Sequence, residues 1–345
     1  MNPYSAASAE YTIMKKLIND PTNVVQEMLD GFAAAHPQHV RLLEGLNVVV
    51  RKDSPVKGKV ALVSGGGSGH EPAHAGYVGA GMLDAACAGD VFTSPNVEQI
   101  LAAIRHVSGG AGVFLIIKNY TGDVLNFEMA MELAGDEGIT VDRIIVNDDV
   151  SVEESARTAG RRGIAGTVFI HKIAGARAEA GGSLDEVKAS AELALKNLRS
   201  MGMAISPCTV PAMGKPTFTL PDGEMEIGMG IHGEPGIKRT KIMSAGQVTE
   251  ILMGGITADL PLRKGDEVAL MTNGLGATPV MELYIMHREA VSLLQAKGVK
   301  VCASYVGEFM TSLEMSGCSL TVLRLNEELK TLLSAPSRTP AFVQV

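Results

Sequence analysis

The sequence predicts an α/β protein of two domains, each with a mostly parallel or mixed sheet covered by helices. Its 345 residues exceed the usual size of a single domain. A hydrophobic share of 46% is sufficient for a large core. Short apolar runs rich in Val and Ile recur, and many are followed by a helical pattern. Such runs are typical of strands in a sheet that helices cover on both faces.

Three apolar runs in the first half each end in a glycine or polar cluster. Residues 59–64 precede GGGSGH, residues 112–118 precede NYTGD, and residues 143–146 precede NDD. In parallel sheets, ligands bind beyond the carboxyl ends of the strands. The three clusters are therefore predicted to lie at the edge of the sheet where a site would form.

A helix predicted from residue 184 to about residue 200 separates the two halves. Ser183 and Glu186 form a capping box at its start, and Gly202 ends it. In the second half, the patterns predict strands over residues 224–229, 267–272 and 319–325, and helices over residues 245–253 and 279–296. We therefore expect a flexible extension over residues 1–13, an N-terminal domain over residues 14–200 and a C-terminal domain over residues 201–345.

The composition argues against several classes of function. The 30 Lys and Arg against 38 Asp and Glu give a formal net charge of −8, without a basic block. Together with 4% aromatic residues and no Trp, this predicts no binding to nucleic acid or to an anionic membrane. The cysteines form no C-x-x-C pair; they are Cys87, Cys208, Cys302 and Cys318. Neither a membrane span nor a signal peptide is seen, so we expect a cytoplasmic protein.

The first candidate site is the glycine loop with the residues Gly66, Gly67, Ser68, Gly69 and His70. A glycine loop between a strand and a helix can direct backbone N–H groups at an anion or a polar ligand. It is not a P-loop, because no Gly-Lys-Ser/Thr follows at the required spacing. It is not a dinucleotide fingerprint either, because His70 stands where the third glycine is needed.

The same stretch contains H-E-x-x-H, the zincin metal signature, from His70 to His74. That motif needs both histidines on one face of an established helix. Pro72 lies between them, and proline is tolerated only in the first turn of a helix. We therefore interpret the match as accidental and assign no metal ligands.

Two further candidate sites follow along the chain. Lys118 ends an apolar run and Asp123 opens the next segment, an arrangement that also suits a snorkelling lysine and a helix cap. His232 lies in GIHGEPG, where nearby glycines leave the ring accessible, and a neutral imidazole is a competent nucleophile. The segment from Asn147 to Asp149 is interpreted as a turn and helix cap. The remaining histidines are expected to be structural: His36, His39, His106, His171 and His287.

Together, these motifs resemble one known family. They are SGGGSGHEP, IIKNYTGDVLNFE, TAGRRG, CTVPAMGKPTFTL and GIHGEPGI, and NGLGATP with the C-terminal strand continues the match. From about Met14 to the end, the chain is similar to the K subunit of dihydroxyacetone kinase. The resemblance implies a two-domain α/β fold, a homodimer, and His232 as the residue that binds dihydroxyacetone as a covalent hemiaminal.

The resemblance also implies roles for the other candidate residues. The glycine loop would bind the oxygens of the substrate, with His70 assisting as acid or base. Lys118 and Asp123 would bind its hydroxyls, and Asp123 would accept the proton of the hydroxyl that is phosphorylated. We therefore expect a phosphotransferase in which His70, Asp123 and His232 are catalytic.

The sequence contains no nucleotide-binding loop and no persuasive magnesium cluster. The resemblance then implies that the phosphoryl group comes from a separate L subunit that holds ADP or ATP and Mg²⁺. That subunit would be recharged by a phosphohistidine carrier fed by phosphoenolpyruvate. Three alternatives stay open: a fragment of a fused ATP-dependent enzyme, a non-catalytic dihydroxyacetone-binding regulator or coactivator, and a kinase subunit for a tetrulose or glyceraldehyde.

Overall fold

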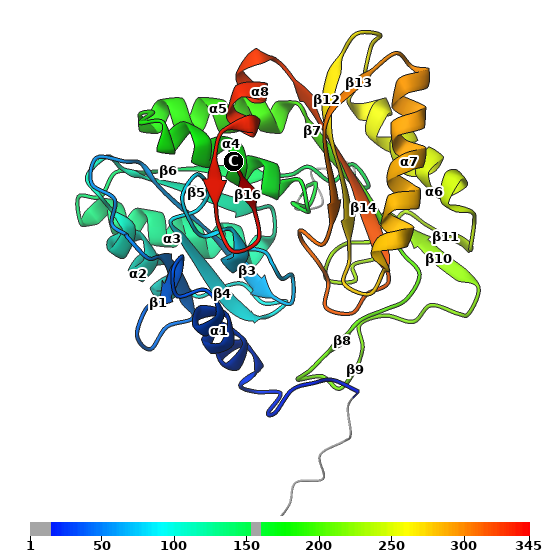
Figure 1. Cartoon of the computed structure of the whole chain (residues 1–345). Helices are drawn as coiled ribbons and strands as arrows, with labels where there is room; N and C mark the ends of the chain where they lie inside the picture. The colour runs from blue at the N-terminus through cyan, green and yellow to red at the C-terminus, as the bar shows by residue number, and fades with distance from the viewer. Residues whose placement is uncertain (1–14, 153–159) are drawn as a thin grey trace, which may run out of the picture.

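Two six-stranded sheets organise the part of the chain that the structure describes, which comprises residues 15–152 and 160–345. In the computed structural model the sheets lie side by side, each with its own helices (Figure 1). The predicted α/β class with two sheets is confirmed. The extension predicted over residues 1–13 lies outside the described residues.

The first sheet has the strand order β1-β2-β4-β3-β5-β6. The bounds of its strands are β1 Val40–Leu42, β2 Val48–Arg51, β3 Ala61–Ser68, β4 Ala85–Val91, β5 Val113–Lys118 and β6 Val141–Val146. Strands β4, β3, β5 and β6 run parallel, whereas β1 and β2 are antiparallel additions. The carboxyl ends of β3, β5 and β6 therefore meet at one edge, as the sequence predicted.

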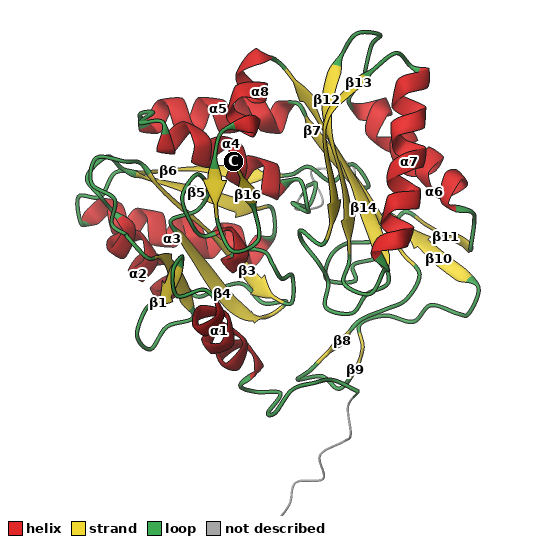
Figure 2. Cartoon of the chain, viewed as in Figure 1, coloured by secondary structure: helices red, strands yellow, loops and turns green. Residues whose placement is uncertain are grey.

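Helices cover both faces of the first sheet (Figure 2). Apolar side chains of α1 (Val24–Ala35), α4 (Thr167–Glu179) and α5 (Leu184–Lys196) pack on one face. Those of α2 (Val97–Val107) and α3 (Thr121–Asp136) pack on the other. None of the helices found among the described residues is both long enough and apolar enough to cross a membrane.

The second sheet is mixed and mostly antiparallel, with the order β11-β10-β7-β14-β12-β13. Only the β12–β13 pair is parallel among its described strands. The bounds are β7 Leu198–Ala204, β10 Glu224–Ile227, β11 Lys238–Lys241, β12 Glu267–Gly274, β13 Lys300–Gly307 and β14 Gly317–Leu325. Helices α6 (Ala245–Asp259) and α7 (Val280–Ala296) pack on one face. A separate two-stranded ribbon joins β8 (Thr209–Val210) to β9 (Lys215–Pro216).

The two sheets are joined through a shared core. Ala269, Met271 and Leu323 of the second sheet belong to the same apolar cluster as the buried face of α4. Leu329, Leu332 and Leu333 of α8 (Glu327–Ser334) belong to the same cluster. After α8, β15 (Ser337–Arg338) pairs with β16 (Val343–Gln344), and Arg338 forms a bridge to Ala80. The helix predicted to reach residue 200 ends at Lys196, and β7 begins at Leu198. The division at residue 200 stays a prediction.

The glycine-rich stretch differs most from its prediction. It is not a loop, because β3 continues through Gly65, Gly66 and Gly67 to Ser68. These residues remain paired with β4, and Gly65 lies opposite Cys87. A turn and the short 3₁₀ helix η1 (Ala75–Tyr77) follow in place of the expected α-helix. The glycines are therefore strand residues whose missing side chains admit close neighbours.

Candidate functional site

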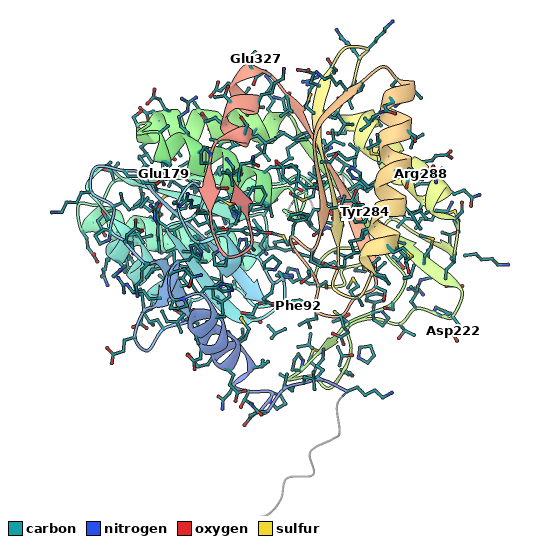
Figure 3. The ribbon with its side chains drawn as sticks, viewed as in Figure 1. Phe92, Glu179, Asp222, Tyr284, Arg288 and Glu327 are labelled. Atoms are coloured by element: carbon teal, nitrogen blue, oxygen red, sulfur yellow. The ribbon has the colours of Figure 1, made fainter. Side chains whose placement is uncertain are left out.

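A loop of the second domain bridges the carboxyl edge of β3 and the segment that carries His232. The Thr311 N–H donates to the backbone oxygen of His70 at 3.1 Å. One residue further on, the Ser312 hydroxyl donates to the backbone oxygen of Ile231 at 2.6 Å. These two bonds bring residues that are 162 positions apart in the sequence face to face. The site therefore lies between the two sheets, where Phe92 is labelled in Figure 3.

His70 and His232 contact each other through their Nε2 atoms, which are 3.0 Å apart. His70 Nδ1 lies 2.7 Å from the backbone oxygen of Thr311, so this nitrogen carries a proton and donates it. His232 Nδ1 lies 2.8 Å from a carboxylate oxygen of Glu234 and likewise donates. Both Nε2 atoms would then be acceptors, which two facing nitrogens cannot be without a proton between them. The geometry therefore places one additional proton on this pair.

Burial and hydrogen bonding set the charge of His70 and of Glu234, the partner of His232. His70 is fully buried, and burial, with Lys118 and His232 adding to it, keeps its pKa well below the ordinary histidine value. Burial acts to raise the pKa of Glu234. The hydrogen bond to His232 and further interactions together outweigh burial and lower this pKa to about 2. The pair therefore consists of a buried neutral ring, His70, and of His232, whose Nδ1 is held by an ionised carboxylate.

Aromatic rings frame the pair. Phe92 stacks on His70, with ring centroids 5.0 Å apart and planes 19° apart. Tyr120 meets the His232 ring edge-on at 4.7 Å. Because the side chain of His232 is 19% exposed, this ring remains accessible despite the cover.

Lys118 and Asp123 form the buried polar side of the site. Lys118 is fully buried at the end of β5, and Asp123 is buried in the first turn of α3. Burial lowers the pKa of Lys118 and raises that of Asp123, while each charge opposes the shift of the other. Lys118 Nζ and Asp123 Oδ1 are buried without a hydrogen-bond partner among the described residues. Because buried polar groups normally have partners, both atoms are suited to a ligand hydroxyl.

Two glycines of β3 and the following turn lie close to the polar side of the site. A Cβ at Gly66 would stand 3.0 Å from Lys118 Nζ, a separation that requires the neighbour to move. Gly69 has a φ of +98°, in the left-handed region that favours glycine. Its N–H donates to the Glu71 carboxylate at 3.1 Å, and the Ser68 hydroxyl donates to Gly89 O at 2.7 Å. Of the predicted substrate-binding residues, Ser68 and Gly69 therefore already use these donors within the chain, and Gly67 lies against Phe92.

The structure also explains the motifs set aside from the sequence. Residues 70–74 form no α-helix, so His70 and His74 do not share a helix face as a zincin requires. Asp148 accepts from the N–H groups of Ile164 and Gly166 at 2.8 and 2.9 Å, at the start of α4. Both N–H groups lie ahead of Thr167, where α4 begins, so the predicted role of this segment as a helix cap stays a prediction.

Several residues of the site were missed from the sequence. Glu234 could have been found, since a carboxylate two positions after a histidine is a common orienting partner. His171 lies fully buried with its ring 5.2 Å from that of His74, and its expected structural role stays a prediction. Phe92, Thr311 and Ser312 gave no signal, because their place depends on how distant segments pack.

Comparison with known proteins identifies the family. The model described as the Dak1 domain matches residues 30–341, and the chain belongs to this family. It is 53% identical over 315 residues to the dihydroxyacetone-binding subunit DhaK of PTS-dependent dihydroxyacetone kinase 1 from Listeria innocua, covering 91% of this chain and 95% of that one. It is 46% identical to the subunit DhaK of the PEP-dependent kinase of Escherichia coli, covering 95% and 99%.

Solved structures agree with this assignment. The dihydroxyacetone kinase of C. freundii superposes with a TM-score of 0.86 at 40% identity, covering 96% of this chain and 61% of that longer one. The dihydroxyacetone kinase operon co-activator DhaQ superposes with a TM-score of 0.87 at 38% identity, covering 92% and 98%. The fold is thus shared by an enzyme and by a regulator.

Proposed function

We propose that this chain is the dihydroxyacetone-binding subunit of a dihydroxyacetone kinase. It binds the ketone as a hemiaminal on His232 and presents a hydroxyl to a separate phosphoryl donor. The observation that carries the proposal is the 3.0 Å contact between the Nε2 atoms of His70 and His232. Two facing imidazole nitrogens need a proton between them to form such a contact. Two relatives named as dihydroxyacetone-binding subunits support the proposal.

Hemiaminal formation follows from that proton. As His70 Nε2 takes the shared proton, the freed Nε2 of His232 attacks the carbonyl carbon and forms a C–N bond. The C=O π bond breaks, and its electron pair moves to the oxygen, which receives the proton from His70. Glu234 keeps Nδ1 of His232 protonated throughout by accepting its hydrogen bond. Glycerol has no carbonyl group and is therefore excluded.

Phosphoryl transfer uses the buried side of the site. Lys118 donates to a substrate hydroxyl, and the Asp123 carboxylate accepts the proton of the hydroxyl that attacks phosphorus. The raised pKa of Asp123 makes it a stronger base than an exposed aspartate. The new O–P bond forms as the bond to the leaving nucleotide breaks, which requires an in-line donor with charge stabilisation around its phosphates.

The donor is proposed to be an L-type subunit with ADP or ATP and Mg²⁺, recharged indirectly by a phosphohistidine carrier. Relatives named as separate subunits, matched over 95% and 99% of their own length, support this arrangement. Among the described residues, no group of three or more His, Cys, Asp and Glu side chains is placed to hold a metal ion. A homodimer in the cytoplasm is part of the same proposal.

A non-catalytic regulator is the second candidate, favoured by the likeness to the co-activator DhaQ. The presence of Asp123 beside Lys118 supports catalysis, since binding a ketone on His232 alone would need no base for a hydroxyl. A tetrulose or glyceraldehyde remains an alternative substrate.

Intact-protein mass spectrometry with dihydroxyacetone, beside a coupled phosphorylation assay, tests the proposal. We expect one triose adduct per chain, no adduct with glycerol, and turnover only when a charged L subunit is added. An adduct without turnover, under conditions in which a known K subunit works, would identify a ketone-binding regulator. No adduct at all would contradict the hemiaminal.

A further inference from the structure

A second pair of histidines lies behind Lys118 and is used by no step above. His74 and His171 are buried, and both contact the hydroxyl oxygen of Ser64. The distances are 3.4 Å from His74 Nδ1 and 3.2 Å from His171 Nε2. Ser64 therefore links two imidazoles to the strand that carries the glycines.

The hydroxyl of Ser64 decides how both rings are protonated. It donates its single proton to the backbone oxygen of Ile116 at 2.7 Å. Its oxygen can then only accept, so His74 Nδ1 and His171 Nε2 must both carry protons. In the neutral ring of His74, the remaining nitrogen, Nε2, is consequently an unprotonated acceptor.

The Nε2 atom of His74 lies near Lys118, the lysine that is proposed to bind the substrate. The position that a Cβ at Gly66 would occupy is 3.0 Å from Lys118 Nζ and 3.5 Å from His74 Nε2, so both atoms border the same small space. Each is buried without a hydrogen-bond partner among the described residues. One is a cationic donor and the other a neutral acceptor, so their chemistry is complementary.

We propose that His74 is a positioning residue for Lys118. One bridging water connects the His74 Nε2 acceptor to one ammonium N–H of Lys118, and this link directs the remaining ammonium donors at the substrate. The water oxygen accepts from Lys118, and a water hydrogen is donated to Nε2. Burial, with the positive charge of Lys118 next in importance, keeps the pKa of His74 well below its ordinary value, so the ring stays a neutral acceptor. The role of Lys118 toward substrate rests on the proposed function.

Two substitutions separate this role from simple packing. The amide of His74→Gln reaches the position of Nε2 and restores an acceptor for Lys118. The shorter amide of His74→Asn reaches only the position of Nδ1, where it meets Ser64. His287→Asn is the matched control, since His287 is half-buried in the second domain and bonds to Thr272 and Ser304.

The first readout needs no substrate. In ¹⁵N spectra of histidine-labelled wild-type protein, we expect His74 to be protonated at Nδ1 and not at Nε2. In ¹³C spectra of labelled lysine, we expect the Lys118 pKa to fall in His74→Asn and to be restored in His74→Gln, because an acceptor favours the charged ammonium. The other groups that face Lys118 are Asp123, Glu234, Asp148, His70 and His171.

The second readout is dihydroxyacetone affinity. We expect Kd to rise about tenfold in His74→Asn and to stay within about threefold of wild type in His74→Gln and in the control. A protonated Nε2 in wild type, or equal Lys118 titration in the Asn and Gln variants, would overturn the proposal. If wild-type protein binds no ketone, the proposed function fails, while the two spectra still decide the role of His74.

Discussion

The two sheets supply opposite kinds of group to one site. The edge of the first sheet contributes buried polar side chains, among them Lys118 and Asp123. The second domain contributes His232, which is 19% exposed and is held by Glu234 from its own loop. The proposed nucleophile thus lies where a ligand can reach it, whereas the groups proposed to orient hydroxyls are shielded from water.

This difference has a physical basis. A hydrogen bond or a charge distinguishes ligands best where water cannot compete for it. Burial therefore strengthens the interactions of the orienting groups with a ligand. A covalent nucleophile needs access and a proton acceptor, which His70 provides from the buried side at 3.0 Å. The contact between these histidines is therefore the point where the two regions depend on each other.

Removing the exposed nucleophile should have the largest effect. His232→Ala is expected to abolish the triose adduct in intact mass spectra and to lower turnover at least about a thousandfold. The buried side should remain folded, because the ring of His232 is not part of an apolar core. His39→Ala serves as a control for loss of a histidine elsewhere. An adduct of normal stoichiometry in His232→Ala would contradict the assignment.

Removing the buried base should separate binding from transfer. In Asp123→Asn we expect the adduct to persist while turnover falls about a hundredfold, because the amide cannot accept the hydroxyl proton. The measurement is the adduct fraction beside the coupled rate with a saturating L subunit. Loss of both in parallel would show that Asp123 serves binding rather than proton transfer.

Weakening the link between the regions should have a smaller effect. Glu234→Gln replaces an ionised partner of His232 with a neutral one and is expected to slow adduct formation about tenfold. Because the pKa of Glu234 is about 2, this difference should be constant from pH 5 to pH 8. Mass spectrometry of samples quenched at successive times, at several pH values, measures the rate of adduct formation. A difference that disappears as the pH falls toward 5 would show that Glu234 is not the permanently charged partner.

Much of this arrangement could be predicted from the sequence. Uninterrupted apolar runs identified β3, β5 and β6, and the rule for parallel sheets placed their polar ends together. His70, Lys118, Asp123 and His232 were all singled out, and the structure brings them to one place, although their roles stay predictions. Local pattern was sufficient here because each residue directly follows or ends a recognisable element.

The remainder depended on long-range packing. Thr311 bonds to His70 across 241 positions, and His171 meets Ser64 across 107. No local pattern indicates such contacts. The glycines were expected to form a loop because glycine usually marks turns. In the structure they lie within a strand, where close neighbours such as Lys118 leave little room for a side chain.

The last prediction concerns stability on the buried side of the site. Burial lowers the pKa of His171 to about 3, so the unfolded chain gains a proton below about pH 6.5 and the folded chain does not. His171 therefore opposes folding increasingly as pH falls from about 6.5 to about 3, by about 1 kcal/mol per unit. The destabilisation caused by His171→Asn, measured by urea unfolding, should shrink by this amount per unit over that range.

Asp148 provides the comparison with the opposite sign. Burial raises its pKa to about 6, so the folded chain binds a proton that the unfolded chain does not bind until the pH falls below about 4. The wild-type protein gains stability from this group as pH falls through 6, and the destabilisation caused by Asp148→Asn should grow there rather than shrink. If both variants show the same slope with pH, burial is not what sets these two protonation states, and the contrast between a shielded and an accessible side of the site loses its physical basis.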